Sequence, residues 1–204
     1  MTINPNELTE KTIAHYESDP EGFHFGTIDH DVSQNYSAFL ESMSNQGPYN
    51  ILDLGCGPGR DLKHFKKLGH IPVGLDGCES FCKMAREYSG CEVLFQDFID
   101  LDLNKSSYDG IFANASLFHV PKVLLTEVVK KLNHSLRKDG ILFSSNPKGN
   151  CEEMMGTRYG NFMQLESYKS QIESCGFSLI RHYYRPPGLP IEESPWLACV
   201  FRKL

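Results

Sequence analysis

The sequence predicts an α/β protein whose parallel β-sheet carries helices on both faces. Short apolar runs alternate with amphipathic stretches without a break from Asn50 to Ser145, which is the pattern of repeated strand–helix–strand units. A glycine-rich turn, Gly55 to Gly59, joins the first of these runs to the first helical stretch. Two further strand-like runs close the chain. At 204 residues the chain is expected to form a single domain that buries roughly 70% of its unfolded surface.

Composition excludes several classes of protein. Twenty basic and 26 acidic residues give a net charge of −6, and no Lys/Arg cluster exceeds a pair, so no nucleic-acid partner is expected. No apolar run approaches membrane-spanning length. The seven cysteines form no C-x-x-C pair, which argues for free thiols, a reducing cytoplasmic location and no metal site. Oligomeric state is left open.

The N-terminal part predicts two helices. Residues 6–17 and 33–43 carry apolar side chains at helical spacing. Between them, residues 23–31 are dense in aromatic and ionisable side chains without regular periodicity. Two interpretations remain open for this segment: a surface loop that packs two phenylalanines, or a segment that faces a small polar substrate.

The glycine turn is the central motif. A strand from Asn50 to Leu54 contains Asp53, and a helix starts at Arg60. Glycine lets the backbone turn sharply and approach a ligand closely, although a purely structural turn is the alternative. A dinucleotide fingerprint would need a third glycine at position 60. Arg60 stands there instead, which weakens a nicotinamide assignment.

Acidic residues follow the next two predicted strands. The strand 71–76 ends in Asp76, about 20 residues after the glycine turn, the separation at which nucleoside-binding α/β units place an acid on the ribose hydroxyls. A helix cap is the alternative for Asp76. The strand 91–96 is followed by Asp97 and Phe98, for which a turn aspartate is the alternative.

The second half of the chain completes the alternation. Strands are predicted over 108–114 and 140–145, with a rim at 116–121, a helix behind it and a turn at 136–140 between them. Residues 147–161 are polar and glycine-rich, and we expect a mobile loop or insertion over the site. A helix over 164–175 and strands over 177–185 and 196–202 follow.

The sequence resembles the class I S-adenosylmethionine-dependent methyltransferases in four features. These are the glycines at every second position after Asp53, the acids at positions 76 and 97, and the strand that starts at Tyr108. The resemblance implies a Rossmann-like, mostly parallel seven-stranded sheet with a C-terminal antiparallel strand pair. It divides the chain into cover helices (1–48), a cofactor-binding core (49–146) and a substrate loop with the C-terminal elements (147–204). The cofactor would be S-adenosyl-L-methionine, and the residues carried over are Asp53, Gly55, Gly57, Gly59, Arg60, Asp76, Gly77, Asp97, Phe98 and Asn114.

Within that family, the segments around the core are similar to small, stand-alone enzymes that methylate small molecules at N, O or S. His119 is the side chain best placed to act as a base or an orienting donor, and a histidine packed at a helix start is the competing interpretation. Tyr16, His30, Arg158 and Tyr159 are candidates for the acceptor pocket. Asn114 is not followed by the Pro-Pro-Tyr/Phe of amino methyltransferases acting on nucleobases or glutamine, which disfavours that subclass.

Two other classes of function remain: a non-catalytic cofactor-binding sensor or partner subunit, and an NAD-dependent oxidoreductase. Binding of S-adenosylmethionine without turnover of an acceptor would indicate the first. A comparison of nicotinamide and S-adenosylmethionine binding would test the second.

Overall fold

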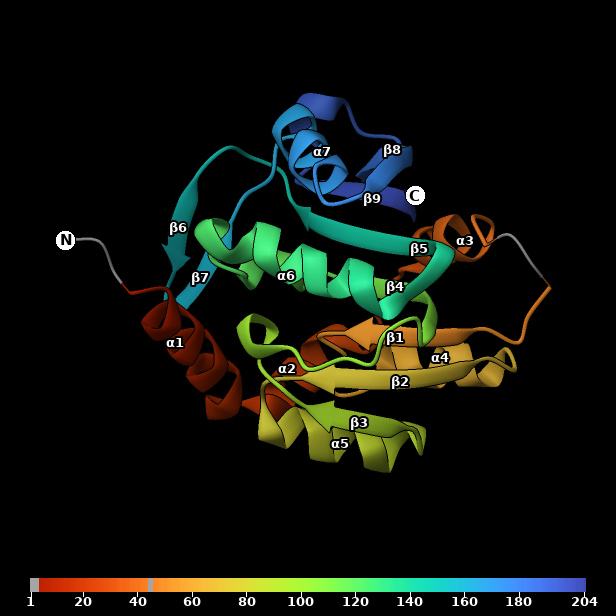
Figure 1. Ribbon diagram of the computed structural model, residues 1–204. Coiled ribbons are helices and arrows are strands. Elements are labelled where there is room, and N and C mark those ends of the chain that lie inside the picture. The colour runs from red at the N-terminus through yellow and green to blue at the C-terminus, as the bar shows by residue number, and fades with distance from the viewer. Residues whose placement is uncertain (1–3, 44–45) are drawn as a thin grey trace.

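The protein is built on one seven-stranded sheet, seen in a computed structural model that describes residues 4–43 and 46–204 (Figure 1). The strand order is β3-β2-β1-β4-β5-β9-β8. The first five strands run parallel, and β9 is antiparallel to both of its neighbours. This confirms the predicted sheet. Its strands are β1 (Asn50–Leu54), β2 (Ile71–Asp76), β3 (Glu92–Phe95), β4 (Tyr108–Asn114), β5 (Leu136–Pro147), β8 (Phe177–Arg185) and β9 (Trp196–Lys203).

Helices cover both faces of the sheet (Figure 1). Successive residues of a strand point to opposite faces, and on β4 Ile111 packs under one helical layer while Phe112 packs under the other. Both side chains are fully buried. One layer holds α3 (Ser33–Leu40), α4 (Arg60–Lys67) and α5 (Glu79–Ser89); the other holds α6 (Lys122–Ser135) and α7 (Leu165–Glu173). The sheet is therefore a buried central layer whose strand ends are left to form a site.

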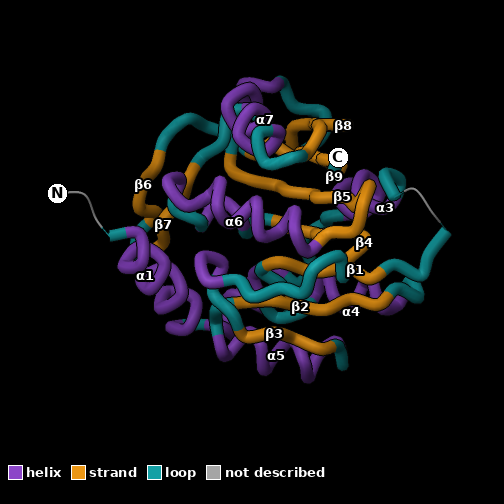
Figure 2. Tube along the Cα trace, viewed as in Figure 1, coloured by secondary structure: helices purple, strands orange, loops and turns teal. Residues whose placement is uncertain are grey.

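An N-terminal helix and a separate hairpin lie together beyond the strand ends. Helix α1 (Pro5–Ser18) packs on a two-stranded sheet of β6 (Glu152–Met155) and β7 (Arg158–Asn161), as Figure 2 shows. The main-chain N–H of Tyr159 donates to Oγ1 of Thr12 over 2.9 Å. Segments nearly 150 residues apart in the sequence are thus joined by a buried hydrogen bond.

Three segments differ from the local structure predicted for them. Residues 20–27 form helix α2 (Pro20–Thr27), with the Asp19 carboxylate accepting from the N–H of Gly22 at its start. Of the segment 23–31, for which a loop was one of two interpretations, only 28–31 lie outside a helix. Phe25 on α2 is 76% exposed and is not packed. Residues 136–140, predicted as a turn, are part of β5. The pairing of β5 with β4 shifts register in this region, and Asp139 has a φ of +61°. Residues 147–161, for which a mobile loop or an insertion was expected, contain the hairpin β6–β7, an insertion with regular structure.

Among the described residues, no helix is both long and apolar enough to cross a bilayer. The same part of the chain contains no group of three or more His, Cys, Asp or Glu side chains arranged to hold a metal ion.

Candidate active site

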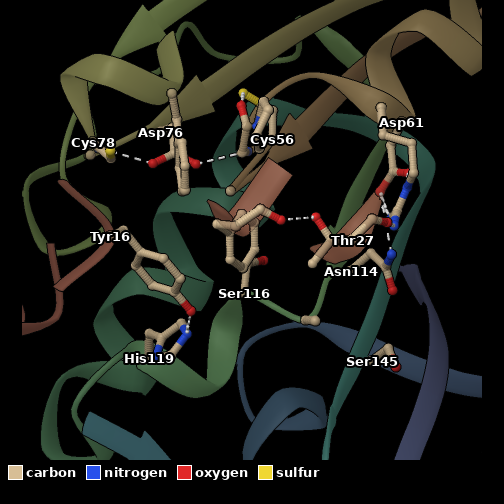
Figure 3. Close-up of a pocket in the computed structure, with 18 of the residues that line it drawn as sticks. Tyr16, Thr27, Cys56, Asp61, Asp76, Cys78, Asn114, Ser116, His119 and Ser145 are labelled. Carbon is tan, nitrogen blue, oxygen red and sulfur yellow. Dashed lines mark hydrogen bonds and ion pairs between the residues drawn. The ribbon is translucent and has the colours of Figure 1, made fainter. Parts of the chain in front are cut away.

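A cavity of about 680 Å³ opens at the carboxyl ends of the parallel strands (Figure 3). It lies where the chain connections leave the sheet in opposite directions from β1 and β4, the place at which open α/β sheets bind ligands. The turn after β1 forms its floor, and residues from α1, α2 and the segment after α2 form its roof.

The glycine turn is built by three glycines with different tasks, all at positive φ. A Cβ added at Gly55 would lie 2.4 Å from Cβ of Ser116, so the turn packs against the rim. A Cβ at Gly57 would meet only the ring of Phe23, at 3.6 Å, because its open side faces the cavity. A Cβ at Gly59 would lie 2.8 Å from Cα of Ala85, which makes this glycine a packing residue between α4 and α5. Gly55 and Gly57 line the cavity.

Asp76 is fixed at the wall of the cavity by two backbone donors. Its Oδ2 accepts from the N–H of Gly57 and its Oδ1 from the N–H of Cys78, both over 2.9 Å. Burial raises the pKa of this carboxyl to about 6, against the lowering effect of those N–H groups. Gly77 lines the cavity beside it. Asp76 lines the cavity, and its carboxylate oxygens have lone pairs left that can accept further hydrogen bonds.

The turn after β3 adds a second acid and an aromatic ring. Asp97 precedes a short 3₁₀ helix, η1 (Phe98–Asp100), and its Oδ1 accepts from the N–H of Ile99 over 3.1 Å. Burial raises the pKa of Asp97. The Phe98 ring lies over the glycine turn, since its Cζ would be 3.0 Å from a Cβ at Gly55. An acceptor and an apolar surface suit the amino edge and the face of a purine.

A buried polar network, which the sequence analysis did not anticipate, closes one side of the cavity. Nε and Nη2 of Arg60 donate to the two oxygens of Asp61 over 2.6 and 3.0 Å. The Tyr36 hydroxyl donates to Oδ1 of Asp61 over 2.5 Å, and Nδ2 of Asn114 to Oδ2 over 3.3 Å. Asp61 occupies a position on the buried face of α4, four residues before Phe65. An acid at an apolar-face position was the signal that could have identified it.

Asp53 lies behind the turn and not on the cavity wall. Its side chain is 1% exposed, and its Oδ2 has no hydrogen-bond partner among the described residues. Burial, and then the nearby carboxylate of Asp61, raise the pKa of Asp53 well above its ordinary value.

Another part of the cavity wall holds a tyrosine–histidine pair. The Tyr16 hydroxyl lies 2.8 Å from Nε2 of His119, and Nδ1 of His119 lies 2.7 Å from the carbonyl oxygen of Tyr159 (Figure 3). A carbonyl oxygen only accepts, so Nδ1 carries the hydrogen and Nε2 accepts from Tyr16. Burial lowers the pKa of His119 to about 4 and raises that of Tyr16. At neutral pH the imidazole is therefore uncharged.

The remaining candidate substrate residues occupy different places. Nη1 of Arg158 donates to the Tyr16 hydroxyl over 3.3 Å. The Tyr159 hydroxyl donates to Oε2 of Glu152 over 2.6 Å and accepts from the N–H of Lys122. Neither Arg158 nor Tyr159 lines the cavity, so both support Tyr16 and His119 from behind. His30 lines the cavity, as do Tyr16 and His119.

The fold, the glycine turn and the two acids define a nucleoside-binding α/β protein of the methyltransferase type. A family model described as a methyltransferase domain matches residues 51–140. An uncharacterized methyltransferase of Staphylococcus carnosus is 26% identical over 112 residues, 55% of this chain and 54% of that protein. The ubiquinone biosynthesis O-methyltransferase of Nitrosococcus oceani is 26% identical over 78% of this chain and 70% of its own length. The chain thus spans about half the length of the first of these relatives.

Among solved structures, the 1,6-didemethyltoxoflavin-N1-methyltransferase of Burkholderia thailandensis, with S-adenosylhomocysteine bound, gives a TM-score of 0.79. The match has 18% identity and covers 100% of this chain and 92% of that one. A TehB-like methyltransferase of Corynebacterium glutamicum gives 0.71 at 18% identity, covering 94% and 99%. At such identity the likeness establishes the fold.

Residues 51–140 thus match a methyltransferase domain, and the whole chain has the Rossmann-like fold of class I S-adenosylmethionine-dependent methyltransferases. The predicted family, fold and cofactor are thereby confirmed.

Proposed function

We propose that this protein transfers the methyl group of S-adenosylmethionine to a nitrogen, oxygen or sulfur atom of a small molecule. One observation carries the proposal: a single cavity is lined both by Asp76 and Asp97, its nucleoside end in this proposal, and by Tyr16 and His119, its acceptor end. Its volume of about 680 Å³ lies within the range of about 300–1,000 Å³ that holds small ligands.

The residues at the nucleoside end fit the cofactor. Asp76 offers a fixed carboxylate for two ribose hydroxyls, and Asp97 with Phe98 offers an acceptor and an apolar face for adenine. Gly57 leaves the turn open toward the cavity. The bound cofactor supplies an electrophilic sulfonium methyl group, so the protein's main task is to hold a nucleophile in line with it.

The chain's contribution at the other end is orientation of that nucleophile. The Tyr16 hydroxyl donates to His119 and accepts from Arg158, which leaves one lone pair for an N–H, O–H or S–H of the acceptor. Because the pKa of His119 is lowered to about 4, its imidazole is a weak base at neutral pH. The pair therefore positions the acceptor, and it favours acceptors that are neutral amines or are already ionised.

The first experiment is calorimetric titration of the purified protein with S-adenosylhomocysteine. It is followed by incubation with S-adenosylmethionine and panels of small amines, thiols, phenols and carboxylates, with S-adenosylhomocysteine release as the readout. Micromolar binding and turnover of at least one acceptor are expected. Tyr16→Phe is expected to keep cofactor binding and lose most of the turnover. Absence of binding would overturn the proposal, and binding without turnover across the panels would favour a non-catalytic binding protein.

A further inference from the structure

The cavity extends beyond the cofactor half to a cation on the far strand. Arg185 ends β8 and is paired in register with Trp196, the first residue of β9, and both line the cavity. Strands β5, β9 and β8 follow β4 in the sheet. With about 4.8 Å between neighbouring strands, the end of β8 is about 14 Å from the end of β4.

The guanidinium of Arg185 is held in place by a main-chain carbonyl group, and no carboxylate in the described part of the chain forms a hydrogen bond with it. Its Nη2 donates to the carbonyl oxygen of Asp31 over 2.7 Å. Its Nε is buried and has no hydrogen-bond partner among the described residues. The Asp31 carboxylate itself accepts from the N–H of Ser33 over 2.9 Å at the start of α3, although it lies close enough for Arg185 to contribute to the lowering of its pKa.

The other charged groups of the cavity wall are committed elsewhere. Arg60 is paired with Asp61. Asp76 and Asp97 lie at the nucleoside end and are held by backbone N–H groups. At the acceptor end, His119 is neutral at pH 7 because burial lowers its pKa to about 4. The acceptor end thus combines a neutral hydrogen-bonding pair, an indole and one guanidinium that no hydrogen-bonded carboxylate among the described residues neutralises.

We infer that the acceptor is a small aromatic acid, whose carboxylate binds Arg185 and whose ring lies against Trp196. Arginine presents planar, paired donors that match a carboxylate, and an indole offers a flat apolar surface. The ring would bridge the space between Arg185 and the cofactor, with the nucleophile near Tyr16. This inference rests on the proposed function and specifies its substrate class.

The test uses two probes of nearly equal shape, 4-aminobenzoate and 4-aminobenzamide, titrated calorimetrically into the protein with and without saturating S-adenosylhomocysteine. We expect the acid to bind at least tenfold more tightly than the amide. Arg185→Gln is expected to abolish that preference, and Arg185→Lys, which keeps the charge but not the planar pair of donors, to retain part of it. Arg181→Gln is the matched control, since Arg181 is on the same strand, pairs with Glu41 and does not line the cavity.

Equal affinity for acid and amide, no binding of the acid, or an unchanged preference in Arg185→Gln would each overturn the inference. Thermal unfolding of each variant shows whether it is folded. If the wild-type protein does not bind S-adenosylhomocysteine, the proposed function is overturned instead. The titrations without S-adenosylhomocysteine still measure the acid preference in that case, so the two failures are distinguishable.

Discussion

The Tyr16 hydroxyl donates a hydrogen bond to Nε2 of His119 over 2.8 Å, joining α1 to the rim that follows β4. The same imidazole donates from Nδ1 to the main chain of β7, and the Tyr159 N–H returns to Thr12 on α1. Helix, rim and hairpin are therefore held by one set of hydrogen bonds around the acceptor end of the cavity. The position of the Tyr16 oxygen, and of any nucleophile bound to it, depends on all three.

This geometry predicts the tautomer and titration of His119. The ring should carry its hydrogen on Nδ1 and stay neutral from pH 8 down to about pH 5, because burial lowers its pKa to about 4. Two-dimensional ¹H–¹⁵N spectra of ¹⁵N-labelled protein, assigned with His119→Gln, measure both properties. A hydrogen on Nε2, or a titration midpoint near the unperturbed value of about 6.5, would contradict the arrangement.

Replacement of Asp76 by alanine is expected to weaken S-adenosylhomocysteine binding. The change removes a charged acceptor for ribose hydroxyls and leaves the N–H groups of Gly57 and Cys78 unpaired. A hydrogen bond to a charged group contributes about 1.5–3 kcal/mol, so a loss of at least about 2 kcal/mol, roughly thirtyfold in Kd, is expected. Calorimetry measures it. Asp102→Ala is the control, since that residue is exposed and lies off the cavity wall, and an equal effect of both changes would contradict the assignment.

The same carboxyl predicts a pH dependence of cofactor binding. Its folded-state pKa is raised to about 6, above the unfolded value of about 3.9, so the native protein binds an extra proton between these values. Its contribution to the stability of the free protein consequently falls as pH rises through that window. Ribose hydroxyls favour the ionised form, so affinity should rise with pH and be about tenfold lower at pH 5 than at pH 7.5. Equal Kd values at the two pH values would contradict this.

The sheet was predictable from the sequence because its evidence is local. The parallel strands contain short apolar runs, and β1, β2 and β4 are each followed by a helix with its own periodicity. The hairpin β6–β7 was missed because Glu152 to Asn161 carries few apolar residues, and its order comes from distant partners such as Thr12. Helix α2 was missed because it has no buried face of its own: none of its residues is fully buried.

The nucleoside end of the site was likewise foreseeable, since an acid after a buried strand can be located by spacing alone. Tyr16, His30 and His119 were also named from the sequence and line the same cavity. Arg185 and Trp196 were not named. Arg185 is one of several charged residues in the segment that forms β8, and only the pairing of β8 with β9 brings it to the cavity beside Trp196. Asp61 depends on Tyr36 and Asn114, which lie far from it in the sequence. The position of Asp61 on the apolar face of α4 is a local signal, but its long-range partners leave no local pattern.

Two glycine substitutions separate backbone strain from cofactor contact. Gly57 and Gly69 have φ values of +50° and +86°, and neither has a neighbour within 3.4 Å of an added Cβ. Alanine at either position should therefore cost a similar amount of stability, about 1 kcal/mol or somewhat more. Only Gly57→Ala places a methyl group in the cavity, and it alone is expected to weaken S-adenosylhomocysteine binding, by tenfold or more. Thermal unfolding and calorimetry give the two quantities. Unchanged affinity in Gly57→Ala would show that the turn does not contact the ligand.

Asp61 is expected to be a larger determinant of stability than the comparable acid Asp109. Its carboxylate is 9% exposed and accepts from Arg60, Tyr36 and Asn114. Asparagine would place an NH₂ group against one of these donors and leave the Arg60 guanidinium, 24% exposed, without a counter-charge. Breaking a buried pair in this way costs about 3–5 kcal/mol.

The Asp109 carboxylate pairs with Arg137 at 25% and 45% exposure and also accepts from the N–H of Asn50. Because water replaces part of what is lost there, Asp109→Asn should cost about 1–2 kcal/mol. Urea denaturation of both variants measures the difference. If Asp61→Asn were no more destabilising than Asp109→Asn, the network around Asp61 would not hold α3 and α4 against the end of β4, and the wall of the cavity would need another support.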